Sequence, residues 1–175
     1  TGLIGTVAIM AGDQSWSAER TTPTNDQLQG ILARMAEEGI DRTVMEVSSH
    51  ALVQERVKNV KFNAVGFTNL SQDHLDYHKN MENYYLAKKL LFSQEYSETA
   101  FINVDNEYGK RLISETSIKA HSLSVSDEAD WNYKEYRRGN GHYQIEISSK
   151  AGNSISGQFP LLGRHNLENL LLAVA

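Results

Sequence analysis

Carboxylate and imidazole side chains are concentrated in residues 69–78, where two Asp and two His lie within six positions. Such a group suits metal binding or proton transfer, and a polar loop with one capping Asp is the structural alternative. Glu46 is a second candidate, because it follows Val44 and Met45 and we expect it to be poorly solvated there. Magnesium prefers carboxylate oxygen and would be its simplest partner; a salt-bridged Glu46 beside a buried His50 is the alternative.

Three further segments carry side chains that suit an anionic or heterocyclic ligand. Thr21 and Thr22 precede a predicted helix, where their hydroxyls can donate to an anion or simply cap the helix. Lys88 lies on the apolar face of a predicted helix, so burial would favour its neutral amine unless the side chain reaches solvent. Asn166 and Asn169 share one helix face, where their amides suit a heterocycle edge or a helix cap.

The elements that must position these residues alternate as in a βαβ sheet. Strands are predicted at residues 3–10, 43–47, 63–68, 100–104 and 121–125. Helices are predicted from Thr24 as the cap to Gly39, over 81–96, over 107–114 and from 166 onward. Antiparallel strands are predicted at 131–138, 142–148 and 154–159. We therefore expect one α/β domain with a mostly parallel sheet flanked by helices and a small antiparallel β extension, with ligands at the carboxyl edge of the strands.

Composition narrows the function classes. The 175 residues suffice for one domain with a core, and 40% hydrophobic and 22% charged residues argue against disorder. A net charge of -5 without any basic stripe argues against nucleic-acid binding, and no apolar run is long enough to span a membrane. The absence of cysteine excludes disulfides, Cys-ligated zinc and thiol catalysis, and it fits a cytoplasmic location.

The candidate segments together match a known family in their order and spacing. The motifs are Thr-Thr-Pro at 21–23, Met-Glu-Val-Ser-Ser-His-Ala-Leu at 45–52, Phe-Thr-Asn-Leu-Ser-Gln-Asp-His-Leu-Asp-Tyr-His at 67–78 and Ala-Lys-Lys-Leu-Leu-Phe at 87–92. Residues 20–92 closely resemble the central, ATP-binding domain of MurE-type Mur ligases, the UDP-N-acetylmuramoyl-tripeptide synthetases. Gly-Arg-His-Asn-Leu-Glu-Asn at 163–169 resembles the adenine-side segment of that family, so the similarity spans nearly the whole chain.

The resemblance implies an ATP-dependent ligase of peptidoglycan synthesis. Such enzymes phosphorylate the free carboxylate of UDP-N-acetylmuramoyl-L-alanyl-D-glutamate, and the amine of meso-diaminopimelate or L-lysine then attacks the acyl phosphate. It implies that Glu46 and His74 bind Mg²⁺ and that Lys88 is carbamoylated and joins them at the metals. The residues that it implies for the UDP-muramoyl-dipeptide are Thr21, Thr22, Ser48, Gln54 and Arg56. The residues that it implies for the adenine of ATP are His165, Asn166 and Asn169.

The sequence departs from this family at one motif, because no G-x-x-x-x-G-K-[ST] phosphate loop occurs in residues 1–175. The chain starts at Thr1-Gly2 without Met, and we expect residues 1–175 to be an incomplete central domain, with the phosphate loop upstream and the N- and C-terminal domains absent. We expect such a fragment to be inactive alone and prone to self-association or marginal stability. The diamino acid and the oligomeric state are not specified by these motifs.

Three other functions share part of this pattern of residues. A folylpolyglutamate synthetase-like ligase shares the acyl-phosphate chemistry, but its substrate gives no reason for the Thr-Thr-Pro and Ser-Ser-His-Ala-Leu motifs. A metal-dependent hydrolase would use Glu46, His50, His74 and His78 as direct ligands of a tightly held metal such as zinc. A non-catalytic scaffold would keep only the fold, and the presence of Glu46, His74 and Lys88 argues against it.

Overall fold

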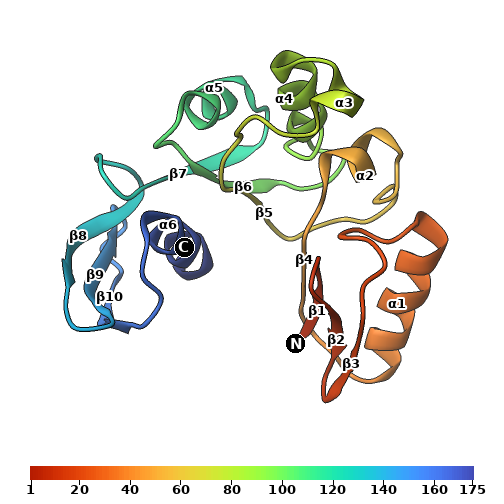
Figure 1. Cartoon of the computed structure of the whole chain (residues 1–175), viewed down its shortest axis with the longest axis horizontal. Helices are drawn as coiled ribbons and strands as arrows, with labels where there is room; N and C mark the ends of the chain where they lie inside the picture. The colour runs from red at the N-terminus through yellow and green to blue at the C-terminus, as the bar shows by residue number, and fades with distance from the viewer. The chain divides into compact units, whose positions relative to one another are not determined.

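The computed structural model describes all 175 residues, and they form two compact units. The first unit consists of Thr1–Val60 and Leu75–Leu90, and the second consists of Lys61–His74 and Leu91–Ala175. Each unit has its own β-sheet (Figure 1). The predicted α/β fold is confirmed: the second unit contains a mostly parallel sheet with flanking helices and an antiparallel extension. The predicted strands are, however, divided between two sheets.

The sheet of the first unit is mixed. Its strand order is β3-β2-β1-β4, where the strands are β1 (Gly2–Ile4), β2 (Ile9–Ala11), β3 (Gln14–Trp16) and β4 (Thr43–Met45). Strand β2 pairs antiparallel with both β1 and β3, and β4 pairs parallel with β1.

The prediction of one strand over residues 3–10 is wrong, because a tight turn divides this apolar run. The Gly5 N–H donates to the Ala8 carbonyl at 3.1 Å, so β1 and β2 form a hairpin. Val7 lies at its tip with 91% of its surface exposed. The hydrophobicity of Val7 therefore contributes nothing to a core, and the polar Thr6 inside the run was the sign of a turn. Strand β3 lies outside the strands predicted from the sequence.

Helix α1 (Asn25–Glu37) agrees with its prediction. The Gln27 side chain accepts a hydrogen bond from the Thr24 N–H at 3.2 Å, as in a capping box, and Gly39 has a φ of +74° after the helix end. Leu28 and Met35 are fully buried on its inner face. A Cβ on Gly2 would lie 2.7 Å from the Met35 sulfur, so β1 and α1 approach closely because residue 2 is glycine.

The opposite face of this sheet carries an aligned row of apolar residues. Leu3 pairs with both Met10 and Val44, so the three side chains lie side by side on β2, β1 and β4. Their exposed fractions are 38%, 40% and 62%. This row, the open face, is therefore much less covered than the face against α1.

Three short helices complete the first unit: α2 (Ser49–Val53), α3 (Leu75–His78) and α4 (Met81–Lys89). Helix α4 was predicted to reach residue 96, but it ends with Leu90 as its C-cap. The next residues belong to the core of the second unit, where Phe92 packs edge-on against Phe67 with ring centres 6.0 Å apart. The apolar residues after Leu90 are thus buried in the core of the second unit and not on a face of α4.

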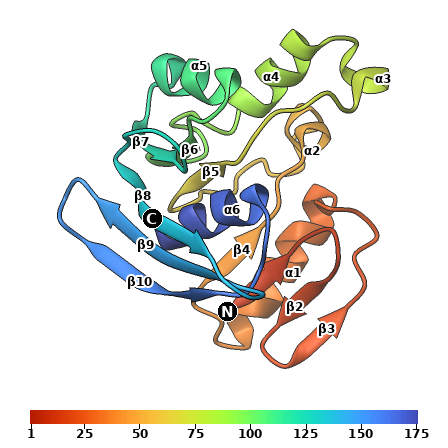
Figure 2. The same ribbon diagram turned by 60° about the vertical axis from the view of Figure 1, so that its left-hand side comes forward.

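The sheet of the second unit has the order β10-β9-β8-β7-β6-β5. Its strands are β5 (Val65–Phe67), β6 (Thr99–Asn103), β7 (Lys119–Ser124), β8 (Trp131–Arg138), β9 (Tyr143–Ser149) and β10 (Ser154–Phe159). Strands β5 to β8 run parallel, and β8 to β10 run antiparallel. Helices α5 (Glu107–Glu115) and α6 (Arg164–Val174) lie on opposite faces of β6 and β7 (Figure 2). None of the helices is long and apolar enough to cross a lipid bilayer.

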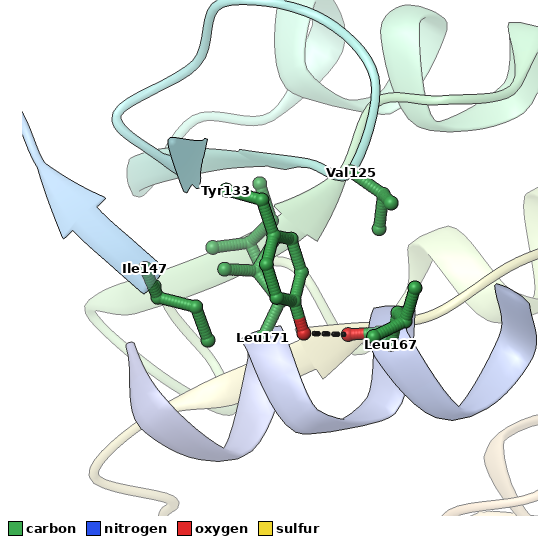
Figure 3. Packing of buried hydrophobic residues seen from close by; sticks show 6 residues of the cluster. Val125, Tyr133, Ile147, Leu167 and Leu171 are labelled. Carbon is green, nitrogen blue, oxygen red and sulfur yellow. Dashed lines mark hydrogen bonds between the residues drawn. The ribbon is translucent and has the colours of Figure 1, made fainter. Parts of the chain in front are cut away.

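The core under the antiparallel strands is organised around Tyr133, whose hydroxyl donates to the Leu167 carbonyl of α6 at 2.9 Å (Figure 3). Ile147 from β9 and Leu171 from the next turn of α6 pack beside it, and both are almost fully buried. Burial raises the pKa of the Tyr133 hydroxyl far above its usual range of about 10, so it stays a neutral donor. This core fixes α6 and therefore the segment that precedes it.

Candidate functional site

Thr22 links the loop before α1 to the segment that follows β4. Its side chain is fully buried. The hydroxyl donates to the Glu46 carbonyl at 2.8 Å and accepts from the Ser48 N–H at 3.1 Å. Two backbone groups of the Glu46–Ser48 turn are thus satisfied by one side chain, which fixes the conformation of that turn. Thr22 therefore supports the site as a buried side chain and holds the backbone of residues 46–48 in place.

Arg56 and Gln54 extend this network beyond the end of α2. The Arg56 Nη1 group donates to the Thr22 carbonyl at 3.0 Å, and Nε and Nη2 donate to the Gln54 Oε1 atom. The Gln54 amide nitrogen lies 3.4 Å from the Tyr77 hydroxyl of α3. Only three of the five N–H donors of the guanidinium are used in these bonds, so two remain for an anionic group. The network brings together three of the residues predicted to bind the UDP-muramoyl-dipeptide.

Ser48 and Thr21, the other two predicted substrate residues, border this network. Ser48 is the N-cap of α2, and its Oγ atom accepts from the Ala51 N–H at 3.2 Å. The Thr21 hydroxyl lies 3.1 Å from the Thr6 hydroxyl in the β1–β2 hairpin. The hydroxyl of Ser48 thus has a structural role as a helix cap, whereas that of Thr21 faces another hydroxyl and can still donate to a ligand.

Glu46 is exposed, which corrects the expectation of a poorly solvated carboxylate after Val44. Val44 itself is 62% exposed on the open face, so its hydrophobicity did not indicate burial. The Glu46 Oε2 atom accepts from the Thr6 N–H at 2.9 Å and from the Thr6 hydroxyl. Oε1 accepts no hydrogen bond from the protein. One oxygen is therefore held by the hairpin while the other can bind a cation.

Lys88 is half-buried on α4, as its place on the apolar face predicted. Its Nζ atom lies 5.5 Å from the centre of the Tyr84 ring, within the range of a cation–π contact. Tyr84 is itself stacked on His78 of α3, with ring centres 5.0 Å apart and an angle of 14° between the planes. The position of Lys88 thus depends on an aromatic stack between α3 and α4.

His74 differs from Glu46 and Lys88 in that it belongs to the second unit. Its φ of +54° is unusual for a residue other than glycine. Asp73 holds this conformation, since its Oδ1 atom accepts from the His74 N–H at 2.7 Å and lies 3.5 Å from Nδ1. The convergence of all three predicted metal-site residues involves both units, and it stays a prediction.

The other two histidines of the possible hydrolase do not form a ligand set. His78 is 5% exposed, and its Nε2 atom lies 2.8 Å from the Ser49 hydroxyl. The His50 ring packs against Tyr77 with centres 4.1 Å apart. No group of three or more His, Cys, Asp or Glu side chains has a metal-binding arrangement. The hydrolase is therefore not supported. The proposed ligase site is not affected by this finding, because one Glu, one His and one modified Lys do not amount to three such side chains.

The residues predicted for adenine lie at the start of α6 in the second unit. Gly163, with a φ of +109°, precedes the helix, and a Cβ there would meet the His165 ring at 2.8 Å. The Asn166 amide nitrogen donates to the Leu162 carbonyl at 2.8 Å, and Asn169 is exposed on the following turn. Asn166 therefore holds the loop that precedes the helix, and its carbonyl oxygen is left for a ligand.

An ion pair anchors this same helix end. The Arg164 Nη2 atom lies 3.1 Å from Oδ2 of Asp105, a side chain that is only 5% exposed and follows β6. The Asp105 carboxylate also accepts from the Val125 N–H at 2.9 Å. A buried carboxylate needs such partners, so this pair fixes the start of α6 at the carboxyl ends of β6 and β7. No motif indicates Asp105, because its role depends on a residue far away in sequence.

Four further residues have roles that the sequence motifs do not indicate. Thr6 orients Glu46, and its place inside an apolar run was the available signal. Ser49, His78 and Tyr84 connect α2, α3 and α4. No sequence signal distinguishes a buried, stacked histidine from a ligand, since both favour aromatic and polar neighbours.

Comparison with known proteins identifies the family. The Mur ligase middle domain model matches residues 1–175. The chain belongs to the Mur ligase middle domain family. This agrees with the predicted resemblance to the MurE-type UDP-N-acetylmuramoyl-tripeptide synthetases, because relatives named as a tripeptide synthetase or as a diaminopimelate-adding ligase match over 99% of the chain.

Two curated relatives illustrate the similarity to this Mur ligase middle domain. The UDP-N-acetylmuramoyl-L-alanyl-D-glutamate--2,6-diaminopimelate ligase of Streptomyces coelicolor is 40% identical over 99% of the chain, and that of Nostoc sp. is 46% identical over 99%. A solved structure of a ligase with the same name matches 99% of the chain with a TM-score of 0.87 and 29% identity, over 36% of its own length. The chain spans 35% and 36% of the two curated relatives, about a third of their length.

Proposed function

We propose that residues 1–175 serve in an ATP-dependent ligase that adds a diamino acid, meso-diaminopimelate or L-lysine, to UDP-N-acetylmuramoyl-L-alanyl-D-glutamate. The observation that carries this proposal is the hydrogen-bonded network of Thr22, Gln54 and Arg56 in a Mur ligase middle domain. The names of the relatives favour this substrate over that of a folylpolyglutamate synthetase. ATP and UDP-linked precursors are made in the cytoplasm, which is therefore the proposed location.

Arg56 is the proposed partner of an anionic group of the UDP-muramoyl-dipeptide. Its two remaining N–H donors suit a carboxylate or a phosphate, and its other bonds hold the guanidinium in one orientation. Thr21 and Ser48 border the same surface and complete the proposed binding residues with Thr22 and Gln54. Because Thr22 uses its hydroxyl within the protein, its contribution to binding is to hold the turn of residues 46–48.

Glu46 and His74 are the proposed ligands of Mg²⁺, together with a carbamate formed on Lys88. The donor set fits this ion, since Glu46 has one carboxylate oxygen without a protein partner and the half-buried Lys88 would supply a second carboxylate once it has reacted with CO₂. In the carbamoylation, the neutral amine bonds to the carbon of CO₂ and a proton is released. Bound Mg²⁺ would neutralise the negative charge where a carboxylate approaches a triphosphate.

The proposed reaction has two steps. A carboxylate oxygen of the D-glutamyl residue attacks the γ-phosphorus of ATP, and the bond to ADP breaks. The amine of the diamino acid then attacks the acyl carbon, the bond to phosphate breaks, and a proton leaves the nitrogen. His165, Asn166 and Asn169 are the proposed contacts of the adenine, and the network around Arg56 orients the carboxylate substrate for the first step.

The phosphate loop is the part of this reaction that residues 1–175 do not supply. We propose that the chain is the incomplete central domain of a longer ligase, with the phosphate loop and two further domains outside these residues. The backbone N–H groups of that loop would otherwise cradle the phosphates. The chain alone is therefore expected to bind ATP weakly and to form no amide.

A ligation assay on the product of the open reading frame that encodes these residues tests the function. The assay measures ADP release and product mass with the UDP-muramoyl-dipeptide and each diamino acid, and with a folate and glutamate. We expect Arg56→Gln to raise the KM for the dipeptide about 10- to 100-fold, since bonds to charged groups contribute about 1.5–3 kcal/mol. Arg42→Gln is the matched control, because Arg42 is exposed and its side chain has no partner.

Two results would reject this function. One is ligation of glutamate to the folate in place of the dipeptide, which would favour the folylpolyglutamate synthetase. The other is tightly bound zinc in the purified protein without any amide product, which would favour a hydrolase. An equal effect of the Arg56 and Arg42 variants on the KM would reject the proposed role of Arg56 in binding the dipeptide.

A further inference from the structure

His78 is a buried polar side chain that the proposed reaction does not use. Its Nε2 atom lies 2.8 Å from the hydroxyl of Ser49, which is 2% exposed in the first turn of α2. The Asn83 amide nitrogen donates to the His78 carbonyl at 3.0 Å, so the backbone of α3 is also tied to α4. A buried imidazole costs more free energy to desolvate than an apolar ring of the same size, so its polar contact with α2 needs an explanation.

The same ring makes a second set of contacts, with aromatic side chains. His78 stacks on Tyr84, 5.0 Å away and nearly parallel, and Tyr77 meets its edge at 4.9 Å. Tyr84 in turn lies 5.5 Å from the Nζ atom of Lys88. Tyr77 carries the hydroxyl next to Gln54. The His78 ring therefore contacts Tyr77, which borders the substrate network, and Tyr84, which borders the lysine.

We propose that His78 is a positioning residue that sets helix α2 relative to helix α4. Its bond to Ser49 places the end of the network around Gln54 and Arg56, and its stack on Tyr84 places Lys88. This inference rests on the proposed ligase function and deepens it by assigning the link between substrate binding and the modified lysine. His78 acts only through other residues and touches no reacting atom.

Three variants separate the hydrogen bond of the ring to Ser49 from its stack on Tyr84. His78→Phe keeps a flat ring for the stack and removes the bond to Ser49, and Ser49→Ala removes the same bond from the other side. His78→Asn keeps a polar group near Ser49 and removes the ring. All lie outside the residues proposed to bind substrate or metal.

The kinetic constants should divide accordingly in the ligase encoded by the open reading frame. His78→Phe and Ser49→Ala should raise the KM for the dipeptide about 2- to 10-fold, the range for one neutral hydrogen bond, with kcat nearly unchanged. The double variant should do no more than either single one, since both remove one bond. His78→Asn should lower kcat about 10- to 100-fold, since a small displacement of a reacting group has effects of this size.

Lys88 can also be followed without any ligase activity. The rate of its reductive methylation in the 175-residue chain, measured by peptide mapping, reports its surroundings, and the half-buried Lys89 is an internal control. His78→Asn should change the Lys88 rate about 2- to 5-fold relative to Lys89, since a cation–π contact has this strength. His78→Phe should leave the ratio unchanged.

The control is His142→Phe, because His142 lies in the exposed turn between β8 and β9. Rates are compared per folded molecule after the folded fraction has been measured by circular dichroism. The inference is overturned if all variants lower only the folded fraction, or if His78→Phe and His78→Asn change kcat, KM and the methylation ratio alike. If the parent enzyme forms no amide but the methylation ratio responds as expected, the positioning stands and the proposed function fails.

Discussion

Replacing Thr22 with Val should destabilise the first unit, although the two side chains have nearly the same shape. The substitution removes a hydroxyl that donates to the Glu46 carbonyl and accepts from the Ser48 N–H. A net hydrogen bond is worth about 1 kcal/mol, and an unpaired buried group costs about 1–3 kcal/mol. Ser48 is half-buried and Glu46 is exposed, so water can replace part of the loss. We expect the free energy of unfolding to fall by about 2–3 kcal/mol.

Thr22→Ser is the matched control, because it keeps the hydroxyl and removes only a methyl group. We expect it to cost about 0.8 kcal/mol, the value for one buried methylene. Urea unfolding followed by tryptophan fluorescence measures both variants. The chain has two tryptophans, one in each unit, so a Trp131→Phe background makes Trp16 report the first unit alone. The reasoning is refuted if Thr22→Val is as stable as Thr22→Ser.

Two other predictions concern a close backbone contact and an acidic group. A Cβ on Gly109 would lie 1.8 Å from the Asn103 carbonyl oxygen, so Gly109→Ala should lower the free energy of unfolding in urea by about 2–3 kcal/mol. Gly30→Ala in α1, where a Cβ meets nothing, should instead raise it by up to about 1 kcal/mol. Equal effects of the two variants would contradict this prediction. Hydrogen bonds from Ser122 lower the pKa of Asp130 below its usual value of 3.8. The ionised Asp130 carboxylate therefore stabilises the fold above pH ~4, and this contribution is lost as the pH falls through the lowered pKa. Asp130→Asn should be less stable than the parent at pH 7, and the difference in the free energy of unfolding should shrink below pH ~4. A difference that stays constant with pH would contradict this prediction.

The elements predicted well from the sequence are those whose signals are local. Thr24 and Gly39 mark the ends of α1 because capping and a positive φ depend on a few neighbouring residues. The bounds of β8 and β10 agree with prediction for the same reason, since glycine-containing turns mark the end of β8 and the start of β10. The errors arose where an apolar residue is exposed, or is buried in an element other than the predicted one. Val7 is exposed at a hairpin tip, and Phe92 is buried in the second unit after α4 has ended.

The candidate site was predicted residue by residue, but its connections were not. Arg56 donates to the Thr22 carbonyl across 34 positions, and no periodicity indicates such a pair. Glu46 was expected to be poorly solvated from its neighbours, yet its environment is set by Thr6 in a hairpin that was read as one strand. The family resemblance supplied the residues, and the structure adds how those of the first unit hold one another.

The most direct test of the proposed acyl phosphate follows the oxygen atoms of the dipeptide carboxylate. UDP-N-acetylmuramoyl-L-alanyl-D-glutamate labelled with ¹⁸O in the reacting carboxylate is ligated to each diamino acid by the enzyme encoded by the open reading frame, and the phosphate is analysed by mass spectrometry. The proposed mechanism predicts that one labelled oxygen appears in inorganic phosphate for each amide formed. Phosphate without label, or label in AMP, would contradict it.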